Sequence, residues 1–305
     1  MLKIKNLALV CVTLFTAAAK SDGPTKLISA DLLAASKSSD WRAVKNENLI
    51  YLELASGRVI IELNPEYAPQ HVANIVKLAH ENYWDGLAVV RVQDNYVVQW
   101  ADPNSENPKL KRPLKKAKAT LTAEFDRTID AKIPFNTLPD RDVYAPETGF
   151  SNGFAAARDN PSKKTWLLHC YGAIGAGRDE GADSGGGTEL YAVIGQAPRH
   201  LDRNVTVVGR VLQGMEFLSS LPRGHASMGF YEKPEMNVPI LRVRWAMDMP
   251  AKDRVKLEVL RTDTPLFEQL IKARQNRQES WFKYQAGHID ACNMTVPVRE
   301  AKSTH

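Results

Sequence analysis

The stretch that decides the fold class is "NLIYLELASGRVIIELNP", residues 48–65. Apolar side chains occupy alternate positions on either side of a Ser56-Gly57 turn: Ile50, Leu52, Leu54, Val59, Ile61 and Leu63. Two runs with a period of two around a two-residue turn are typical of a β-hairpin. The stretch therefore predicts two antiparallel strands.

A helix and a second hairpin are predicted next. From Pro69 the apolar residues recur at helical spacing, and proline is favoured in the first turn of a helix, so we expect a helix from Pro69 to about Tyr83. The stretch "GLAVVRVQDNYVVQW", residues 86–100, returns to a β-rich composition with a turn at Asp94-Asn95. It predicts another hairpin.

Several later stretches have the composition of short strands. They are "WLLHCYGAIGAGR" (166–178), "ELYAVIG" (189–195), "NVTVVGRVL" (204–212) and "VPILRVRW" (238–245). Many short strands with few helices indicate a mainly β fold, either a barrel or a sandwich.

Three regions lie outside this pattern. Residues 20–47 are mixed and polar, with a short helical patch around Asp31 to Lys37. Residues 102–162 are rich in Pro, Asp, Asn and Lys, and we expect extended loops with brief elements there. The segment from Pro265 has an apolar face and a basic face, which predicts an amphipathic helix docked on the parent domain.

The first residues have the layout of a secretory signal peptide. Lys3 and Lys5 precede an apolar run, residues 7–19, that closes in three alanines. We therefore expect residues 1–19 to be removed and the mature chain to begin near Lys20, in the periplasm or outside the cell. An uncleaved anchor is the alternative.

Composition describes an ordinary soluble globular protein. The chain has 305 residues, of which 44% are hydrophobic and 25% charged, and its net charge of +5 includes Lys3 and Lys5. The small basic excess gives little reason to expect a nucleic-acid partner. The basic run at 109–116 has the composition of a solvated loop, with nucleic acid or anionic lipid as the alternative partner. No stretch after the signal approaches the roughly 20 apolar residues of a spanning helix, so we expect no stable membrane insertion.

Two cysteines remain once Cys11 is removed with the signal. An even number in an oxidising compartment permits one disulfide, between Cys170 and Cys292. Two separate buried thiols are the alternative.

The sequence Asp183-Ser184-Gly185-Gly186 looks like the nucleophile loop of chymotrypsin-type proteases. A serine nucleophile needs a histidine base within reach, and no histidine of the chain has the expected setting. We expect Ser184 to be a residue of a glycine-rich loop, without a catalytic role.

Two of these stretches resemble cyclophilins. Residues 86–100 resemble the stretch in which phenylalanine-histidine-arginine leads through a turn to a glutamine and two glycines. Residues 201–218, "LDRNVTVVGRVLQGMEFL", resemble the later run with valine-phenylalanine-glycine-arginine-valine and glycine-methionine. The order of elements also fits, including Asn74 in "APQHVANIVKLA". The chain resembles an exported bacterial cyclophilin-type peptidylprolyl isomerase over about residues 49–101 and 166–245.

The resemblance implies an eight-stranded antiparallel barrel capped by two helices, with added loops and a C-terminal helix. The expected division is a signal peptide (1–19), an N-terminal segment (20–47), a cyclophilin-like domain (48–248) with an insertion at about 102–165, and a C-terminal extension (249–305) packed on the domain.

It also implies a site for cis/trans isomerisation of X-Pro bonds. Arg91 matches the catalytic arginine of the family. The positions implied for substrate binding are Gln99, Tyr96, Val97, Gly177, Glu189, Tyr191, His200 and Leu201. Each also has a structural alternative: Arg91 as a surface ion-pair residue, Gln99 as a solvated strand residue, and the others as core or surface.

Four departures from the family pattern alter the pocket. Glu189 replaces a glutamine, His200 a tryptophan or phenylalanine, Val205 a frequent histidine, and Trp100-Ala101 the paired glycines. Loss of the tryptophan implies weak cyclosporin binding.

The resemblance thus implies a monomeric foldase for unfolded or proline-containing polypeptides, with no cofactor and no metal. The alternative is a non-catalytic periplasmic chaperone or protein-binding module on the same barrel.

Overall fold

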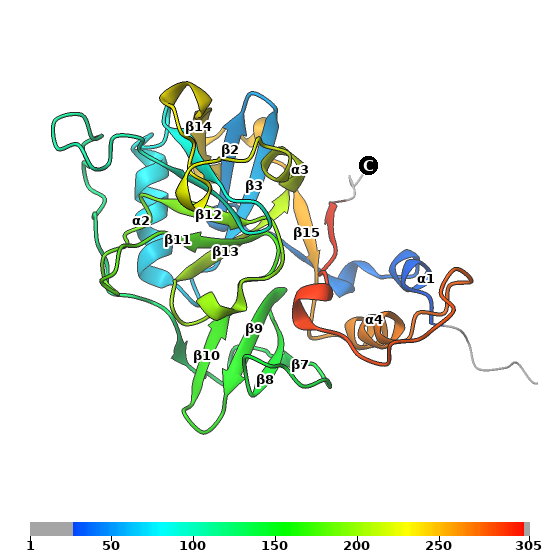
Figure 1. Cartoon of the computed structure of the whole chain (residues 1–305). Coiled ribbons are helices and arrows are strands. Elements are labelled where there is room, and N and C mark those ends of the chain that lie inside the picture. Colours follow the sequence, from blue (N-terminus) through cyan, green and yellow to red (C-terminus); the bar gives the residue numbers. More distant parts are fainter. Residues whose placement is uncertain (1–26, 302–305) are drawn as a thin grey trace, which may run out of the picture.

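The computed structural model describes residues 27–301, and its centre is a closed antiparallel barrel with strand order β11-β12-β5-β4-β14-β2-β3-β13 (Figure 1). The eight strands are β2 (Leu49–Leu54), β3 (Gly57–Leu63), β4 (Ala88–Val92), β5 (Val97–Ala101), β11 (Ala173–Ala176), β12 (Leu190–Val193), β13 (Val207–Gln213) and β14 (Val238–Trp245). The expected eight-stranded barrel is confirmed.

The hairpin β2–β3 buries both of its faces. Ile50 and Ile61 point into the barrel core, whereas Leu49, Tyr51 and Ile60 belong to a second core outside the barrel. The turn needs glycine, because a Cβ at Gly57 would lie 2.3 Å from the ring of Phe217.

Two helices cover the barrel, as expected. Helix α2 (Pro69–His80) packs on β14, and the short helix α3 (Met215–Ser219) packs on β3. Helix α2 ends at His80, before the predicted end near Tyr83. Two hydrogen bonds, from the Glu81 backbone N–H to Lys77 and from the Asn82 N–H to Ala79, close its last turn.

The insertion forms a sheet of its own, and the expectation of extended loops is wrong for residues 147–151 and 154–159. An antiparallel sheet of order β6-β10-β9-β8-β7 lies below the barrel in Figure 1. Its strands are β6 (Arg127–Thr128), β7 (Asn136–Thr137), β8 (Glu147–Ser151), β9 (Phe154–Asp159) and β10 (Lys164–Leu167). Asn152 and Gly153, with φ of 48° and 86°, form the turn between β8 and β9. Two adjacent positive φ angles are the signature of a tight hairpin turn.

The two end regions of the described chain pair with each other. Strand β1 (Trp41–Ala43) pairs with β15 (Leu257–Leu260), which in turn pairs with β16 (Val298–Glu300). Helix α1 (Ser29–Ala34) lies beside α4 (Pro265–Gln275) (Figure 1).

Helix α4 begins at Pro265, where the amphipathic helix was predicted. The Thr264 side chain caps its first turn by accepting a hydrogen bond from the Phe267 backbone N–H. Phe267, Leu270 and Ile271 are buried in the same core as Leu49 of the barrel. Burial of this face holds the extension on the outside of the hairpin β2–β3.

Within residues 27–301, eight 3-10 helices connect these elements. They are Ser38–Asp40, Asn46–Asn48, Arg199–Leu201, Ser227–Gly229, Pro234–Met236, Ala246–Asp248, Ala251–Asp253 and Ala291–Asn293. A disulfide joins Cys170, between β10 and β11, to Cys292 in the last of them. No helix within residues 27–301 is long and apolar enough to cross a membrane. The predicted signal peptide, residues 1–19, lies outside the described residues.

Candidate active site

Three neighbouring barrel strands place the central site residues in one row. Arg91 on β4 pairs with Gln99 on β5, and Gln99 pairs with Tyr191 on β12. Directly opposed residues of antiparallel strands have side chains on the same face. The hairpin predicted from residues 86–100 thus brings the arginine and the glutamine together.

The guanidinium of Arg91 donates hydrogen bonds in three directions. Its Nη1 donates to Gln99 Oε1 at 3.0 Å, its Nη2 to Gln93 Oε1, and its Nε to the Met228 carbonyl at 2.7 Å. Burial lowers the pKa of Arg91, although Tyr96 and Tyr191 act in the opposite direction. An arginine remains charged even so, and the group is a fixed, half-buried cation.

Aromatic rings surround this cation. The Arg91 guanidinium carbon lies 5.7 Å from the ring centre of Tyr96 and 5.5 Å from that of Phe230. The exposed ring of His200 stacks on Tyr96 with 6.1 Å between the centres and 4° between the planes. His200 thus places a flat ring against Tyr96, at the position where the sequence resemblance implies a tryptophan or phenylalanine. It faces solvent more than the pocket.

Both the oxygen and the nitrogen of the Gln99 side-chain amide form hydrogen bonds. Its Oε1 accepts from Arg91, and its Nε2 donates to Glu189 Oε2 at 2.8 Å. Burial raises the pKa of Glu189, opposed by the hydrogen bond from Gln99, while Asp179 and Glu106 raise it further. Gly177, expected beside the groove, is next to Glu189: a Cβ there would lie 3.0 Å from the Glu189 Cβ.

A hollow of about 740 Å³ opens beside this part of the site. Glu189 and Phe230 line it together with Asp102, Glu106 and Asp179. The lining therefore carries several carboxylates close to the Arg91–Gln99 row.

Tyr191 and Val97 lie deeper than the rest of the site. They are only 6% and 2% exposed, and they share a core cluster with Phe154 and Leu167 of the insertion sheet. The Tyr191 ring lies on Gly175, where a Cβ would approach it to 2.2 Å. The insertion therefore packs against the residues that form the floor of the expected proline pocket.

A series of buried polar groups holds the hydroxyl of Tyr191, and no sequence pattern predicts it. His169 Nε2 lies 2.8 Å from the Tyr191 hydroxyl, and His169 Nδ1 lies 3.0 Å from Asp202 Oδ1. Burial and the nearby Tyr96 and Asp202 raise the pKa of Tyr191, opposed by two arginines, so its hydroxyl stays neutral.

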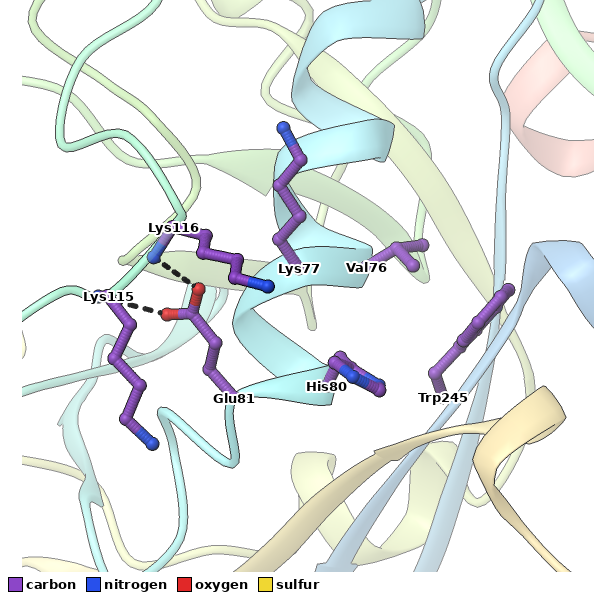
Figure 2. Close-up of a pocket in the computed structure, with 7 residues that line it drawn as sticks. All are labelled: Val76, Lys77, His80, Glu81, Lys115, Lys116 and Trp245. Atoms are coloured by element: carbon purple, nitrogen blue, oxygen red, sulfur yellow. Dashed lines mark hydrogen bonds between the residues drawn. The ribbon is translucent and has the colours of Figure 1, made fainter.

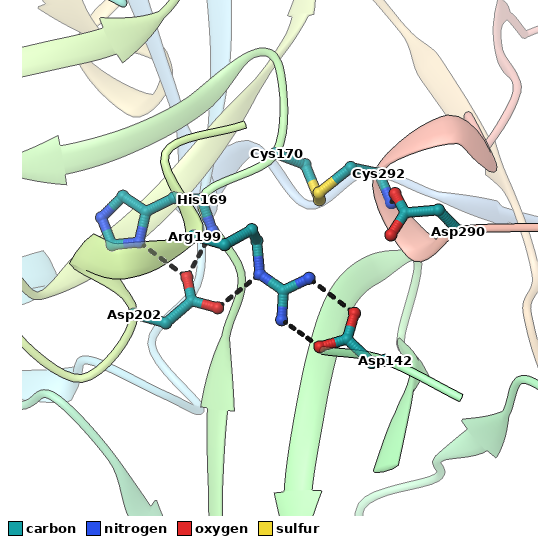
Figure 3. The surroundings of a disulfide bond; sticks show 7 residues. All are labelled: Asp142, His169, Cys170, Arg199, Asp202, Asp290 and Cys292. Atoms are coloured by element: carbon teal, nitrogen blue, oxygen red, sulfur yellow. Dashed lines mark hydrogen bonds and ion pairs between the residues drawn. A yellow bond between two sulfur atoms is a disulfide. The ribbon is translucent and has the colours of Figure 1, made fainter. Parts of the chain in front are cut away.

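The series of polar contacts that begins at the Tyr191 hydroxyl continues from Asp202 to the insertion (Figure 3). Asp202 Oδ2 accepts from Arg199 Nε at 2.5 Å, and both Nη groups of Arg199 donate to Asp142 at 2.9 and 3.1 Å. Burial alone lowers the pKa of Arg199, but the two carboxylates outweigh it and raise that pKa above its ordinary value. Four groups from three separate parts of the sequence thus fix one tyrosine.

The remaining predicted residues lie around this centre. Leu201 and Val205 are half-buried, and Val205 packs against the cluster that contains Tyr191. Ser184 lies in the loop before β12, where its hydroxyl donates to the Gly181 carbonyl at 2.6 Å and accepts from the Asp179 N–H at 2.9 Å. Its hydroxyl therefore closes a turn.

A separate hollow of about 410 Å³ lies beside helix α2 (Figure 2). Val76 and Trp245 form its apolar part, and the Glu81 carboxylate there accepts from the backbone N–H groups of Lys115 and Lys116. None of the predicted site residues lines it. Within residues 27–301 no group of three or more His, Cys, Asp or Glu side chains is arranged to hold a metal.

Residues 49–245 match the sequence model of one protein family, described as cyclophilin type peptidyl-prolyl cis-trans isomerase/CLD. A probable peptidyl-prolyl cis-trans isomerase of Brucella suis is 27% identical over 194 residues, which are 63% of this chain and 81% of that protein. A putative thylakoid lumen peptidyl-prolyl cis-trans isomerase of Synechocystis is 23% identical over 188 residues, 59% of this chain and 45% of that protein.

The fold is also similar to a solved structure, the cyclophilin AquaCyp293 from Hirschia baltica. The TM-score is 0.69 at 26% identity, over 86% of this chain and 95% of that one. The similarity therefore reaches beyond residues 49–245 into the added parts of the chain.

Proposed function

Since the chain belongs to the cyclophilin-type peptidyl-prolyl cis-trans isomerase family, we propose that it is a foldase for exported polypeptides in which Arg91 stabilises the twisted X-Pro bond. The observation that carries this proposal is the cross-strand row in which Arg91 donates to Gln99 at 3.0 Å.

The reaction requires rotation about an amide bond. Resonance gives this rotation a barrier of about 18–20 kcal/mol. Twisting removes the resonance and leaves a lone pair on the proline nitrogen. A guanidinium directed at that nitrogen binds the twisted form more tightly than either planar form, which is catalysis by differential binding.

To donate a hydrogen bond to the proline nitrogen, Arg91 must give up one of its present hydrogen bonds. In the free protein it donates to Gln99, Gln93 and the Met228 carbonyl. The guanidinium has five N–H donors, so it keeps some of these bonds while one N–H turns toward the substrate nitrogen. Gln99, released from Arg91 or Glu189, then holds the substrate backbone.

One charge-assisted hydrogen bond is worth about 1.5–3 kcal/mol, or about tenfold to a hundredfold in rate. The rest of the acceleration comes from holding the proline ring against Tyr96, Leu201 and the Tyr191 floor while the other side of the bond turns.

The proposed place of action is the periplasm or the cell exterior. The Cys170–Cys292 disulfide supports it, because such bonds persist in oxidising compartments. The Synechocystis relative is named for the thylakoid lumen, also a compartment reached by export. Cell fractionation and mass spectrometry of the mature N-terminus test this: we expect a start near Lys20 and no free thiol in the unreduced protein.

A proline-limited refolding assay tests the activity. We expect the wild type to accelerate refolding and Arg91→Ala to lose about tenfold or more of kcat/KM. Arg242→Ala is the matched control, since Arg242 is an exposed arginine on the barrel strand β14. No acceleration by the wild type, or equal activity of Arg91→Ala, contradicts the proposal.

That contrary result would favour a non-catalytic chaperone on the same barrel. The observation in its favour is that Arg91 already has three protein acceptors. A binding module would still suppress aggregation of unfolded proteins in the assay, and Arg91→Ala would not change that suppression.

A further inference from the structure

Three separate parts of the chain form the walls of one groove. It has a volume of about 400 Å³ and lies between barrel residues 195–199, insertion residues 141–144 and extension residues 290–293. Cys292 lines it, and the disulfide partner Cys170 directly precedes Tyr171, another lining residue (Figure 3).

Apolar side chains are exposed in this groove. Val143, Tyr144 and Tyr171 line it and are 91%, 56% and 51% exposed. They are three of the nine large hydrophobic side chains that are exposed within residues 27–301. Clustered exposed apolar groups with a polar rim are typical of a binding surface.

The charges at the groove balance each other. Asp142 is paired with Arg199 beneath the surface, and Arg141 and Asp290 are the exposed charged residues of the lining. A groove with an apolar middle and no net charge at its rim fits an uncharged segment rich in aromatic and aliphatic residues.

The walls are fixed to one another. The disulfide joins the extension to the barrel, and the paired bonds from Arg199 to Asp142 join the barrel to the insertion. The Arg199 guanidinium carbon also lies 5.3 Å from the ring centre of Tyr144. A preformed surface loses little conformational entropy when a ligand binds.

The groove adjoins the candidate active site. Arg199 lines the groove, and the next two residues of the same 3-10 helix, His200 and Leu201, belong to the site. On the other side the Gln196 backbone N–H donates to Asn95 Oδ1, next to Tyr96. A polypeptide that leaves the proline pocket past His200 therefore reaches the groove directly.

We propose that this groove binds a second, apolar segment of the same unfolded polypeptide whose proline lies at Arg91. The inference rests on the proposed function, because it extends the substrate site. Binding of one segment raises the effective concentration of the other, so long unfolded chains bind more tightly than short peptides without any new contact at the proline.

The test compares two substrates of the full mature protein. One is a tetrapeptide with a single Ala-Pro bond, and the other is an unfolded protein whose refolding is proline-limited. For Tyr144→Ser with Tyr171→Ser we expect the ratio of protein to tetrapeptide kcat/KM to fall about tenfold, which corresponds to about 1.4 kcal/mol for the loss of the two aromatic rings together. Leu241→Ser, 57% exposed on β14, is the control, and its ratio should match the wild type.

A binding measurement separates this inference from the proposed function. The probe is a fluorescently labelled protein kept unfolded by reduction and carboxymethylation, and its Kd is read by anisotropy. We expect the Kd of the double variant to rise about tenfold. If the Kd and the ratio of protein to tetrapeptide kcat/KM are both unchanged, the proposed role of the groove is wrong, even if the enzyme is active. An inactive wild type with the expected shift in Kd overturns the proposed function and leaves the groove.

Discussion

The two halves of the candidate site are held by different kinds of structure. Arg91 and Gln99 lie opposite each other on one hairpin and bond to each other directly. Tyr191 is held by a chain of buried groups that runs through His169 and Arg199 to Asp142 of the insertion.

This difference separates a local requirement from a long-range one. Arg91 and Gln99 of the first half are only eight residues apart in sequence, whereas Asp142 and Arg199 are 57 residues apart. The polar row therefore belongs to the barrel alone. The pocket floor at Tyr191 depends on the insertion, and through the disulfide on the extension. Mutations that destabilise these added parts should therefore disturb the position of Tyr191 and leave the Arg91–Gln99 contact unchanged.

The largest expected effect is loss of the disulfide. Cys170→Ser with Cys292→Ser should lower the free energy of unfolding by about 4–5 kcal/mol, because a loop spanning 122 residues is no longer closed in the unfolded chain. Urea denaturation measures this, and reduced wild type should match the variant. Hydrogen exchange should quicken at residues 142–170 and stay slow in the hairpin 88–101. An equal loss of hydrogen-exchange protection in both regions would show that the hairpin, too, depends on the disulfide.

The next effect tests the polar row. Arg91→Lys keeps the charge but lacks the planar fork that bonds Gln99 and Gln93 together. We expect kcat/KM to fall about tenfold to a hundredfold, the worth of one charge-assisted hydrogen bond, with unfolding in urea little changed. Full activity of the lysine variant would mean that charge alone, without the fork, is sufficient.

A smaller effect tests the floor. Tyr191→Phe leaves buried His169 Nε2 without its partner and should destabilise the protein by about 1–2 kcal/mol. Tyr67→Phe is the matched control in the same cluster. Its hydroxyl lies 3.3 Å from Thr165 Oγ1, and Thr165 keeps its bond to the Ala157 carbonyl. Equal urea midpoints for the two variants would show that the polar chain is not needed to hold the floor.

The smallest effect depends on pH. Burial raises the pKa of Glu189, so the folded protein binds this proton more tightly than the unfolded chain, and stability falls as pH rises through the folded pKa. Glu189→Gln removes that penalty. The variant should be more stable than the wild type at neutral pH by less than about 1 kcal/mol. The gain should vanish at about pH 3, well below the ordinary glutamate pKa of about 4.3, where Glu189 is protonated in both states. A gain that persists at low pH would assign the effect to packing.

The half of the site formed by Arg91 and Gln99 can largely be predicted from the sequence. The turn at Asp94-Asn95 predicts the hairpin that brings Arg91 close to Gln99. A two-residue turn there would pair Arg91 with Val98, whereas the structure pairs Arg91 with Gln99 because the connection contains one more residue. Alternating apolar residues likewise predict the barrel strands, and Pro265 predicts the start of α4.

The contacts that hold Tyr191 cannot be predicted in the same way. No local pattern connects His169 with Asp202 or Arg199 with Asp142, because their proximity exists only after the barrel and insertion have packed. The insertion sheet did leave one signal. Asn152-Gly153 is a strong hairpin turn, but β9 on its C-terminal side contains three alanines and no clear alternation, so the strands themselves are weakly marked.

The sheet formed by β1 and β15 has a consequence for the order in which the chain folds. A ribosome releases Trp41 long before its partner Leu260, and until then the outer face of β2–β3, with Leu49 and Tyr51, lacks the part of its cover that comes from the C-terminal extension. Pairings of such long sequence separation form slowly. A protein of this design completes its own core last, where its two end regions pair, and until then it presents an incompletely covered apolar strand of the kind that other folding factors bind.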